Sequence, residues 1–332
     1  MHFPAVDPSA AGRIGEGGYM AQKSGVSLPP LNRRKIFTRS SIPLHLMLIP
    51  GIVVIFIFHY IPLAGLVIAF QRFVPAKGMF GDQRWIGLEN FEYIFSMPNT
   101  LNVLRNTVVI AFAKIVLGLV VPITVALMLN ELSQRRLKKG IQTIIYFPHF
   151  ISWIIFATII ESLLSPSSGL VNRLLNALGM DSIYFLADNR FFQGTIILTD
   201  VWKSFGYGTV VYMAAITSID PSLYEAAAID GAGRWQQTVH VTLPGMRMII
   251  VLMMVLSLGN VLNAGFDQVY NLYSPVVYET GDIIDTMVYR LGLESAQFGP
   301  ASAVSLFKSI VSMAFISASY LIADKCFDYR LF

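Results

Sequence analysis

Six apolar stretches, each close to the length that crosses a lipid bilayer, most constrain what this chain can fold into. They cover residues 43–70, 103–129, 141–164, 193–217, 247–270 and 301–323. A bilayer core needs about 20 apolar residues, and lipid offers backbone amides no partner, so each stretch must be helical. Only 13% of the residues are charged, against about 25% in soluble domains. The sequence therefore predicts an all-α integral membrane protein with six transmembrane helices.

The placement of lysine and arginine predicts how the chain crosses the membrane. With a cytoplasmic N-terminus, the inside segments hold 14 of these residues and the outside segments hold six. Because basic residues favour the cytoplasmic side, we expect both termini inside. Residues 1–41 are then a flexible cytoplasmic tail, and residues 42–332 form the transmembrane domain. The same bias explains the excess of 24 basic over 20 acidic residues, so we expect no nucleic-acid partner.

The segment 218–246, between the fourth and fifth spans, carries clear helix start and stop signals on the predicted cytoplasmic side. Asp220 is a good N-cap, and Pro221 suits the first helical position. Gly231 is expected to end this helix. The segment is therefore predicted to be ordered rather than a loose linker.

A second short helix is predicted from Arg234 to about His240, ending before Pro244. The first helix is rich in alanine, which gives it a narrow apolar side with Glu225 beside it as one fixed charge. Such a rigid knob could enter a groove on another protein. The alternative at this point is a capped loop helix with incidental alanines.

This segment resembles the Glu-Ala-Ala loop of binding-protein-dependent ABC importer permeases. The family pattern is Glu-Ala-Ala, three residues, Gly, nine residues, Ile, one residue and Leu-Pro. Every spacing agrees, and Val replaces Ile, in the series Glu225, Ala226, Ala227, Gly231, Val241, Leu243 and Pro244. The resemblance implies the type I importer permease fold.

Three further stretches are similar to the carbohydrate branch of these permeases, which is LplB-type and MalF-like: Tyr60-Ile61-Pro62, Gly65 to Phe70, and Trp85 to Phe91. The similarity covers roughly residues 42–332. It implies a multi-pass permease of the bacterial cytoplasmic (inner) membrane that imports oligo- or polysaccharide. The branch includes importers of acidic oligouronides such as alginate or pectin fragments.

The resemblance also implies partners and residue roles. In the family this helix couples the permease to an ATP-binding subunit. It implies that Glu225 pairs with a basic residue of that subunit, that Ala226 and Ala227 pack in its cleft, and that Gly231 supplies the bend. Arg234, Leu243 and Pro244 complete the expected coupling set. The expected partners are a second permease in a heterodimer, two ATP-binding subunits, an extracytoplasmic solute-binding protein, the oligosaccharide and membrane lipid.

The chain is not expected to be an enzyme. It contains no Gly-Lys dipeptide and hence no phosphate-binding Walker A loop. ATP and Mg²⁺ are therefore expected on the partner ATPase subunits, with no cofactor or metal bound by this chain.

Polar residues recur in the fifth span at three- and four-residue steps, which predicts one helical stripe. They are Asn260, Asn263, Asp267 and Asn271, with Tyr270 close by. Amides and carboxylates can bond sugar hydroxyls, and rings can stack on sugars, so the stripe could line the substrate pathway. The alternative is helix–helix contact through buried amides.

Charged residues inside spans are functional candidates. Asp200 and Lys203 could pair on one face of the fourth span, whereas Lys114 and Lys308 could reach the interface or face a partner. A row of serines in the sixth span is interpreted as packing: Ser302, Ser305, Ser309 and Ser312. An ion-coupled carrier that uses Asp200, Lys203 and Asp267 is the alternative function. A membrane enzyme is a third possibility that no nucleophile–base motif supports.

Overall fold

The computed structural model describes residues 42–79 and 81–327, so the predicted tail, residues 1–41, lies outside the described residues. The chain divides into two units, residues 1–58 and 59–332. Within the first unit, helix α1 (Ile42–Ile55) contains Pro50 and is followed by a π-helical turn, η1 (Phe56–Tyr60). Its apolar side chains are exposed, as expected for a surface that faces lipid.

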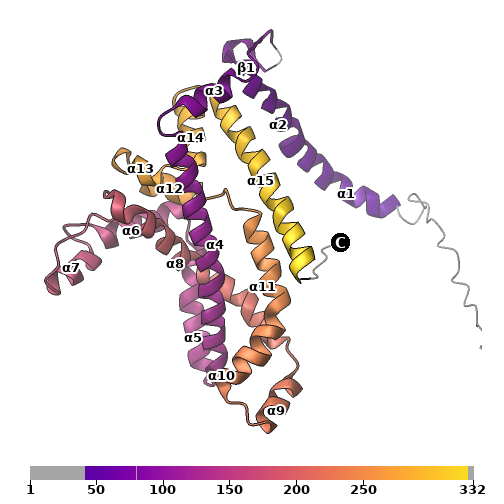
Figure 1. Ribbon diagram of the computed structural model, residues 1–332, viewed down its shortest axis with the longest axis vertical. Coiled ribbons are helices and arrows are strands. Elements are labelled where there is room, and N and C mark those ends of the chain that lie inside the picture. The colour runs from indigo at the N-terminus through magenta and orange to yellow at the C-terminus, as the bar shows by residue number, and fades with distance from the viewer. Residues whose placement is uncertain (1–41, 80, 328–332) are drawn as a thin grey trace, which may run out of the picture. The chain divides into compact units, whose positions relative to one another are not determined.

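The second unit, residues 59–332, is helical except for a two-stranded antiparallel pair, in which Gln71 lies opposite Trp85 (Figure 1). In chain order its elements are α2 (Ile61–Leu63), η2 (Ala64–Phe70), β1 (Gln71–Arg72), η3 (Pro75–Lys77), β2 (Arg84–Trp85), α3 (Glu89–Ser96), α4 (Thr100–Glu131), α5 (Arg135–Tyr146), η4 (Phe147–Phe150), α6 (Trp153–Leu164), α7 (Leu170–Ala177), α8 (Asn189–Thr217), α9 (Pro221–Ile229), α10 (Arg234–Gln237), η5 (Thr238–Thr242), α11 (Leu243–Leu258), α12 (Phe266–Leu272), η6 (Pro275–Val277), α13 (Tyr278–Gly281), α14 (Ile284–Tyr289), η7 (Arg290–Glu294) and α15 (Phe298–Phe327).

Four helical runs of the described chain are long and apolar enough to cross a membrane: 43–70, 100–131, 234–258 and 298–321. A fifth candidate, residues 135–164, is bent by 107° between η4 and α6. The third predicted span, residues 141–164, is therefore not one continuous helix. Pro148 lies at the bend, and the Ser152 hydroxyl accepts a hydrogen bond from the Ile155 amide at 3.4 Å to start α6.

Helix α8 is 29 residues long and covers the predicted fourth span, although Asp200 and Lys203 make it less apolar. It packs lengthwise on α4 and also contacts α5 and α11. Gly206 allows α5 to come close, because a Cβ atom there would lie only 1.9 Å from the Ile145 carbonyl oxygen. The buried apolar side chains form three clusters. One joins α4, α6, α8 and α12, a second joins α3, α4, α14 and α15, and a third joins α4, α8 and α11.

The fifth span is not one helix, which corrects the predicted stripe. Helix α11 ends at Leu258, and α12 begins only at Phe266. Residues 259–265 form turns between them, and Gly265 has a φ of 91°, a left-handed conformation that favours glycine. The four residues of the expected stripe, and Tyr270 near them, therefore belong to two separate structures.

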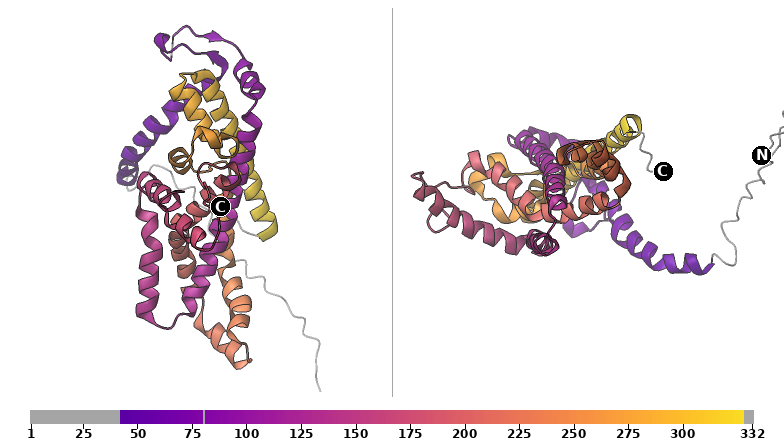
Figure 2. Two further views of the ribbon diagram at one scale, coloured as in Figure 1. Left: turned by 90° about the vertical axis from the view of Figure 1, so that its left-hand side faces the viewer. Right: turned by 90° about the horizontal axis from the view of Figure 1, so that it is seen from below.

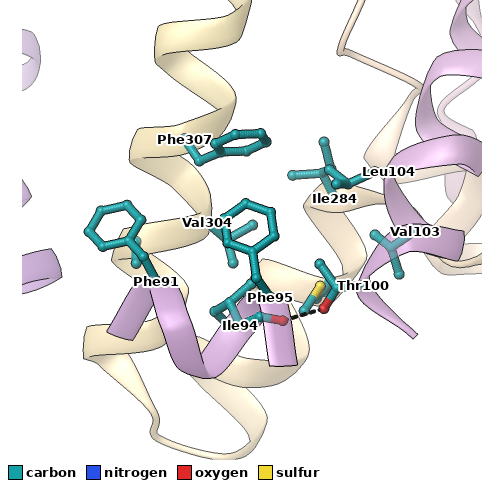
Figure 3. A pocket seen from close by; sticks show the side chains of 11 residues that line it. Phe91, Ile94, Phe95, Thr100, Val103, Leu104, Ile284, Val304 and Phe307 are labelled. Carbon is teal, nitrogen blue, oxygen red and sulfur yellow. Dashed lines mark hydrogen bonds between the residues drawn. The ribbon is translucent and has the colours of Figure 1, made fainter. Parts of the chain in front are cut away.

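Helices α3, α14 and α15 pack closely around a small apolar gap (Figure 3). The Phe95 and Phe307 rings meet edge to face at 5.4 Å, and the Thr100 hydroxyl donates to the Ile94 carbonyl at 2.6 Å. The gap measures about 10 Å³, which is too small for a ligand. This region therefore packs α3, α14 and α15 together and does not form a binding site.

Candidate functional site: a docking helix joined to a polar groove

Helix α9 is a short, well-capped helix that ends at a sharp bend. The Asp220 carboxylate accepts a hydrogen bond from the Ser222 amide at 2.9 Å, which lowers the pKa of Asp220. At the other end, the Ala232 amide donates to the Ala227 carbonyl at 2.9 Å, and Gly231 has a φ of 81°. Both predicted helix signals are confirmed, and they make the knob rigid from its first residue to its bend.

The outer surface of α9 is mostly exposed and carries both apolar groups and a carboxylate. Glu225 and Ala226 are exposed, and Ala227 is half-buried. Glu225 has no ion pair among the described residues. Ile229 beside it is 86% exposed. An exposed apolar surface with one unpaired carboxylate suits a partner that offers an apolar cleft and a cation.

Trp235, just after the bend, is 77% exposed and extends this apolar surface. Sequence reasoning missed both Ile229 and Trp235, because it followed the Glu-Ala-Ala pattern and did not ask which large apolar residues the bend leaves uncovered. The available signal was their position, two residues before Gly231 and two residues after Gly233.

Side chains attach the bend to the rest of the bundle. Arg234 Nη1 lies 3.2 Å from Glu131 Oε2, at the end of α4. The Tyr224 hydroxyl lies 3.0 Å from the Thr242 hydroxyl, so α9 is also tied to the start of the next long helix. Arg234 therefore contacts α4 of its own chain, and this ion pair attaches the bend between α9 and α10 to the bundle.

The second short helix does not end before Pro244, which corrects the sequence prediction. Helix α10, the π turn η5 and α11 form one helical run of 25 residues, Arg234–Leu258. Pro244 is exposed, Leu243 is half-buried, and both lie in the first turn of α11, directly after η5. A π turn rearranges the backbone hydrogen bonds, which lets the helix continue past the residue that lacks an amide donor. The knob is thus joined without a break to a long span.

This helical run leads directly into a polar groove. The groove measures about 270 Å³. Its polar lining residues are Lys114, Asp200, Ser257, Asn260 and Asn263. Asn260 and Asn263 are exposed, and their amides make only local hydrogen bonds, to the Leu256 carbonyl and from the Gly265 amide. Two amides that can both donate and accept therefore face open space.

A buried charge network fixes the floor of this groove. Lys114 Nζ lies 3.3 Å from Asp200 Oδ1 and donates to the Ala264 carbonyl at 2.7 Å and to Gln268 Oε1 at 2.5 Å. The Gln268 amide in turn donates to the Thr199 hydroxyl at 2.8 Å. Helices α4, α8 and α12 are therefore joined at the turn that separates α11 from α12.

Asp200 pairs with Lys114 rather than with Lys203, so the predicted pairing is wrong. Lys203 instead donates to the His149 carbonyl at 3.0 Å and lies 5.1 Å from the centre of the Trp153 ring. It thus braces the bend before α6. Lys308 is likewise engaged, in an ion pair with Asp285. Both lysines are thus held by carboxylates of the same chain, Lys114 by Asp200 and Lys308 by Asp285.

The other three members of the expected stripe lie on α12, away from this groove. Asp267 is exposed, and the Asn271 amide donates to its carbonyl at 2.6 Å. Tyr270 stacks on Phe266 at 5.2 Å, and its hydroxyl donates to that of Tyr289 at 3.3 Å. The structure therefore supports Asn260 and Asn263 as groove residues and separates Asp267, Tyr270 and Asn271 from them.

The predicted serine row on α15 borders two open hollows. Ser302 and Ser305 lie in a hollow of about 590 Å³, and Ser305, Ser309 and Ser312 lie in one of about 500 Å³. Ser309 is exposed, whereas the other three serines are half-buried. The packing role of this row stays a prediction.

Comparison with known proteins identifies the family. Residues 118–328 match the family described as "Binding-protein-dependent transport system inner membrane component". The chain belongs to this family. It is 40% identical over 282 residues to the polygalacturonan/rhamnogalacturonan transport system permease protein YteP of Bacillus subtilis, covering 85% of this chain and 88% of that protein. It is 37% identical to Protein LplB of the same organism over 289 residues, covering 87% and 91%.

Solved structures confirm the fold. A bacterial ABC transporter involved in the import of the acidic polysaccharide alginate matches with a TM-score of 0.80 and 37% identity, over 86% of this chain and 96% of that chain. A bacterial alginate ABC transporter in complex with an alginate pentasaccharide-bound periplasmic protein matches with a TM-score of 0.80 and 36% identity, over the same shares. The permease is thus an inner membrane transport component with the type I importer fold, and it is not an enzyme. Membership in this family excludes the ion-coupled carrier and the membrane enzyme.

Proposed function

We propose that this permease imports acidic oligosaccharides, such as fragments of pectin or alginate, as one of two membrane subunits of an ATP-driven importer. The observation that carries the substrate class is the similarity just described. A relative at 40% identity transports polygalacturonan and rhamnogalacturonan, and a structural neighbour at 37% identity imports alginate. All of these substrates are acidic polysaccharides rich in hydroxyl groups.

The chemistry of the groove is compatible with such a substrate. Asn260 and Asn263 can donate to carboxylates and exchange hydrogen bonds with hydroxyls. The charges of Lys114 and Asp200 compensate one another at 3.3 Å, so the groove presents amides rather than a fixed net charge. A pathway needs contacts that hold a sugar weakly enough to release it, and neutral amides satisfy that need.

The proposed coupling runs from α9 to this groove. Glu225 pairs with a cation of an ATP-binding subunit, which itself holds ATP and Mg²⁺, while Ala226, Ile229 and Trp235 occupy the cleft. Motion of that subunit moves the Arg234–Leu258 run as one body. The turn at Asn260 and Asn263 moves with it, and access to the groove changes. The second permease and the extracytoplasmic binding protein complete the assembly.

Uptake by cells tests the proposal. A strain lacking this permease is complemented with the wild type or with Glu225→Ala, and the uptake of labelled trigalacturonate, alginate trisaccharide and maltotriose is measured. We expect that only the wild type restores uptake, and that it takes up at least one of the two acidic sugars faster than maltotriose. Equal uptake of all three would contradict the substrate class, and full uptake with Glu225→Ala would contradict the coupling route.

A further inference from the structure

The start of helix α5 carries a concentrated positive patch that the transport mechanism does not use. Four of its first five residues are basic: Arg135, Arg136, Lys138 and Lys139. Within the described residues none of these side chains makes an ion pair or a hydrogen bond, and all except Lys138 are exposed. No Asp or Glu occurs between residues 132 and 160. The patch is thus uncompensated by the part of the chain that the structure describes.

One face of α5 points away from the bundle and changes character along its length. Ile141 and Ile145 pack inward against the core between α4, α8 and α11. The opposite face starts with Arg136 and Lys139 and continues with Ile144 and Phe147, which are 73% and 66% exposed. Figure 2 shows α5 at the edge of the helices in both views. This outward face is therefore cationic at its first turn and apolar two turns later.

The length of this gradient matches one leaflet of a bilayer. From Arg136 to Phe147 the helix rises about 16 Å at 1.5 Å per residue, which is close to half of the roughly 30 Å hydrocarbon core. Helical side chains tilt toward the N-terminus. The basic groups therefore point away from the apolar end and can reach the headgroup layer while their stems cover apolar surface.

We propose that this patch, residues 135–139, binds the headgroups of anionic phospholipids in the leaflet at that end of the bundle. A lipid satisfies both halves of the face at once, with its phosphate on the cations and its acyl chains along Ile144 and Phe147. A soluble protein docked on the cations would leave those apolar residues uncovered. Charge complementarity and the apolar continuation of the same face thus favour lipid over a protein partner.

The site adjoins the attachment of the docking helix. Glu131, four residues before the patch, holds Arg234 at 3.2 Å, and the α4–α5 turn lies at the same end of the bundle as α9 and α10 (Figure 1). Bound anionic lipid therefore lies beside the joint through which the Arg234–Leu258 run is held. The lipid site itself does not depend on the identity of the transported sugar.

Native mass spectrometry of the full chain tests the proposal. The chain is released from nanodiscs that contain phosphatidylcholine and phosphatidylglycerol in equal amounts. The bound molecules of each lipid are then counted. Each basic residue near a surface contributes about fivefold in preference for anionic lipid. Arg136→Gln/Lys139→Gln should therefore lower the phosphatidylglycerol preference by about 25-fold. An Arg136→Lys/Lys139→Arg variant should keep the preference.

The matched control removes two exposed cations elsewhere that make no ion pair among the described residues, Arg105→Gln/Arg173→Gln, and should leave the preference unchanged. Raising the salt concentration should weaken the wild-type preference, because salt screens exposed charges. Equal binding of both lipids by wild type, or an undiminished preference in the Gln variant, would overturn the proposal. The proposal would also be overturned if Arg136→Gln/Lys139→Gln lost capture of the ATP-binding subunit while its lipid preference stayed unchanged, because the patch would then be a protein contact.

Discussion

The ion pair between Lys114 and Asp200 gives the sharpest test of how the groove is built. The Lys114 side chain is 9% exposed and that of Asp200 is 25% exposed. Removing one partner of a buried pair typically costs about 3–5 kcal/mol, because the other charge is left unpaired. Asp200 borders the groove and is partly reached by water, so we expect Lys114→Met to cost about 3 kcal/mol, near the lower end of that range.

Asp200→Asn should cost less. It keeps an oxygen near Lys114, whose ammonium still donates to the Ala264 carbonyl and to Gln268. One weakened charge-assisted hydrogen bond is worth about 1.5–3 kcal/mol. In the double variant no charge is left unpaired, so its cost should fall below the sum of the single costs by at least about 1 kcal/mol.

The free energy of unfolding in mixed detergent micelles is the quantity to measure for all three variants. Arg105→Met is the matched control, since Arg105 is exposed on the same helix and should change stability by less than about 0.5 kcal/mol. Single costs that add within about 0.5 kcal/mol in the double variant would refute the coupling between Lys114 and Asp200.

Three further predictions concern the docking helix. Glu225→Gln should abolish uptake while protein level and stability stay unchanged, because Glu225 is exposed and unpaired among the described residues; loss of the protein from the membrane would instead indicate a structural role. Gly231→Ala should cost about 1 kcal/mol, since L residues resist its left-handed φ of 81°, whereas Gly233→Ala at a φ of −69° should cost less; equal costs in thermal unfolding would contradict this. The capping contribution of Asp220 is complete above the ordinary aspartate pKa and is lost as the pH falls through its lowered folded pKa. Exchange of the first-turn amides of α9, corrected for intrinsic rates, should therefore rise as the pH falls below about 4 in wild type and not in Asp220→Asn.

Local signals in the sequence predicted the docking helix well. Asp220 and Gly231 act on backbone groups within a few residues of themselves, so their effect depends little on the rest of the fold. The same local rule failed at Pro244. There the helix continues through a π turn, a rearrangement that packing of the long span favours and that residue preference alone does not show.

The partners of buried charges could not be predicted from spacing along one helix. Lys203 is three residues from Asp200, but the pairing lysine is Lys114, which lies on a neighbouring helix. Periodicity shows which residues share a face and not which helix that face meets. Gly259 and Gly265, on either side of Asn260 and Asn263, were a sequence signal for the break in the fifth span. The signal was missed because the apolar stretch 247–270 is long enough to be one helix.

The central claim is that the exposed docking helix and the amide-lined groove are joined by one stiff helical run. Spin labels on His240→Cys and Leu256→Cys, with native Cys326 replaced by Ser, measure that run directly in the assembled importer. Both side chains are exposed, and the two positions are 16 residues apart, or about 24 Å along a helix. We predict that this distance is the same with and without ATP, while the distance from position 256 to a label at Val120 on α4 changes. A nucleotide-dependent change between positions 240 and 256 would show that the run bends near Pro244, and the proposed coupling route would be wrong.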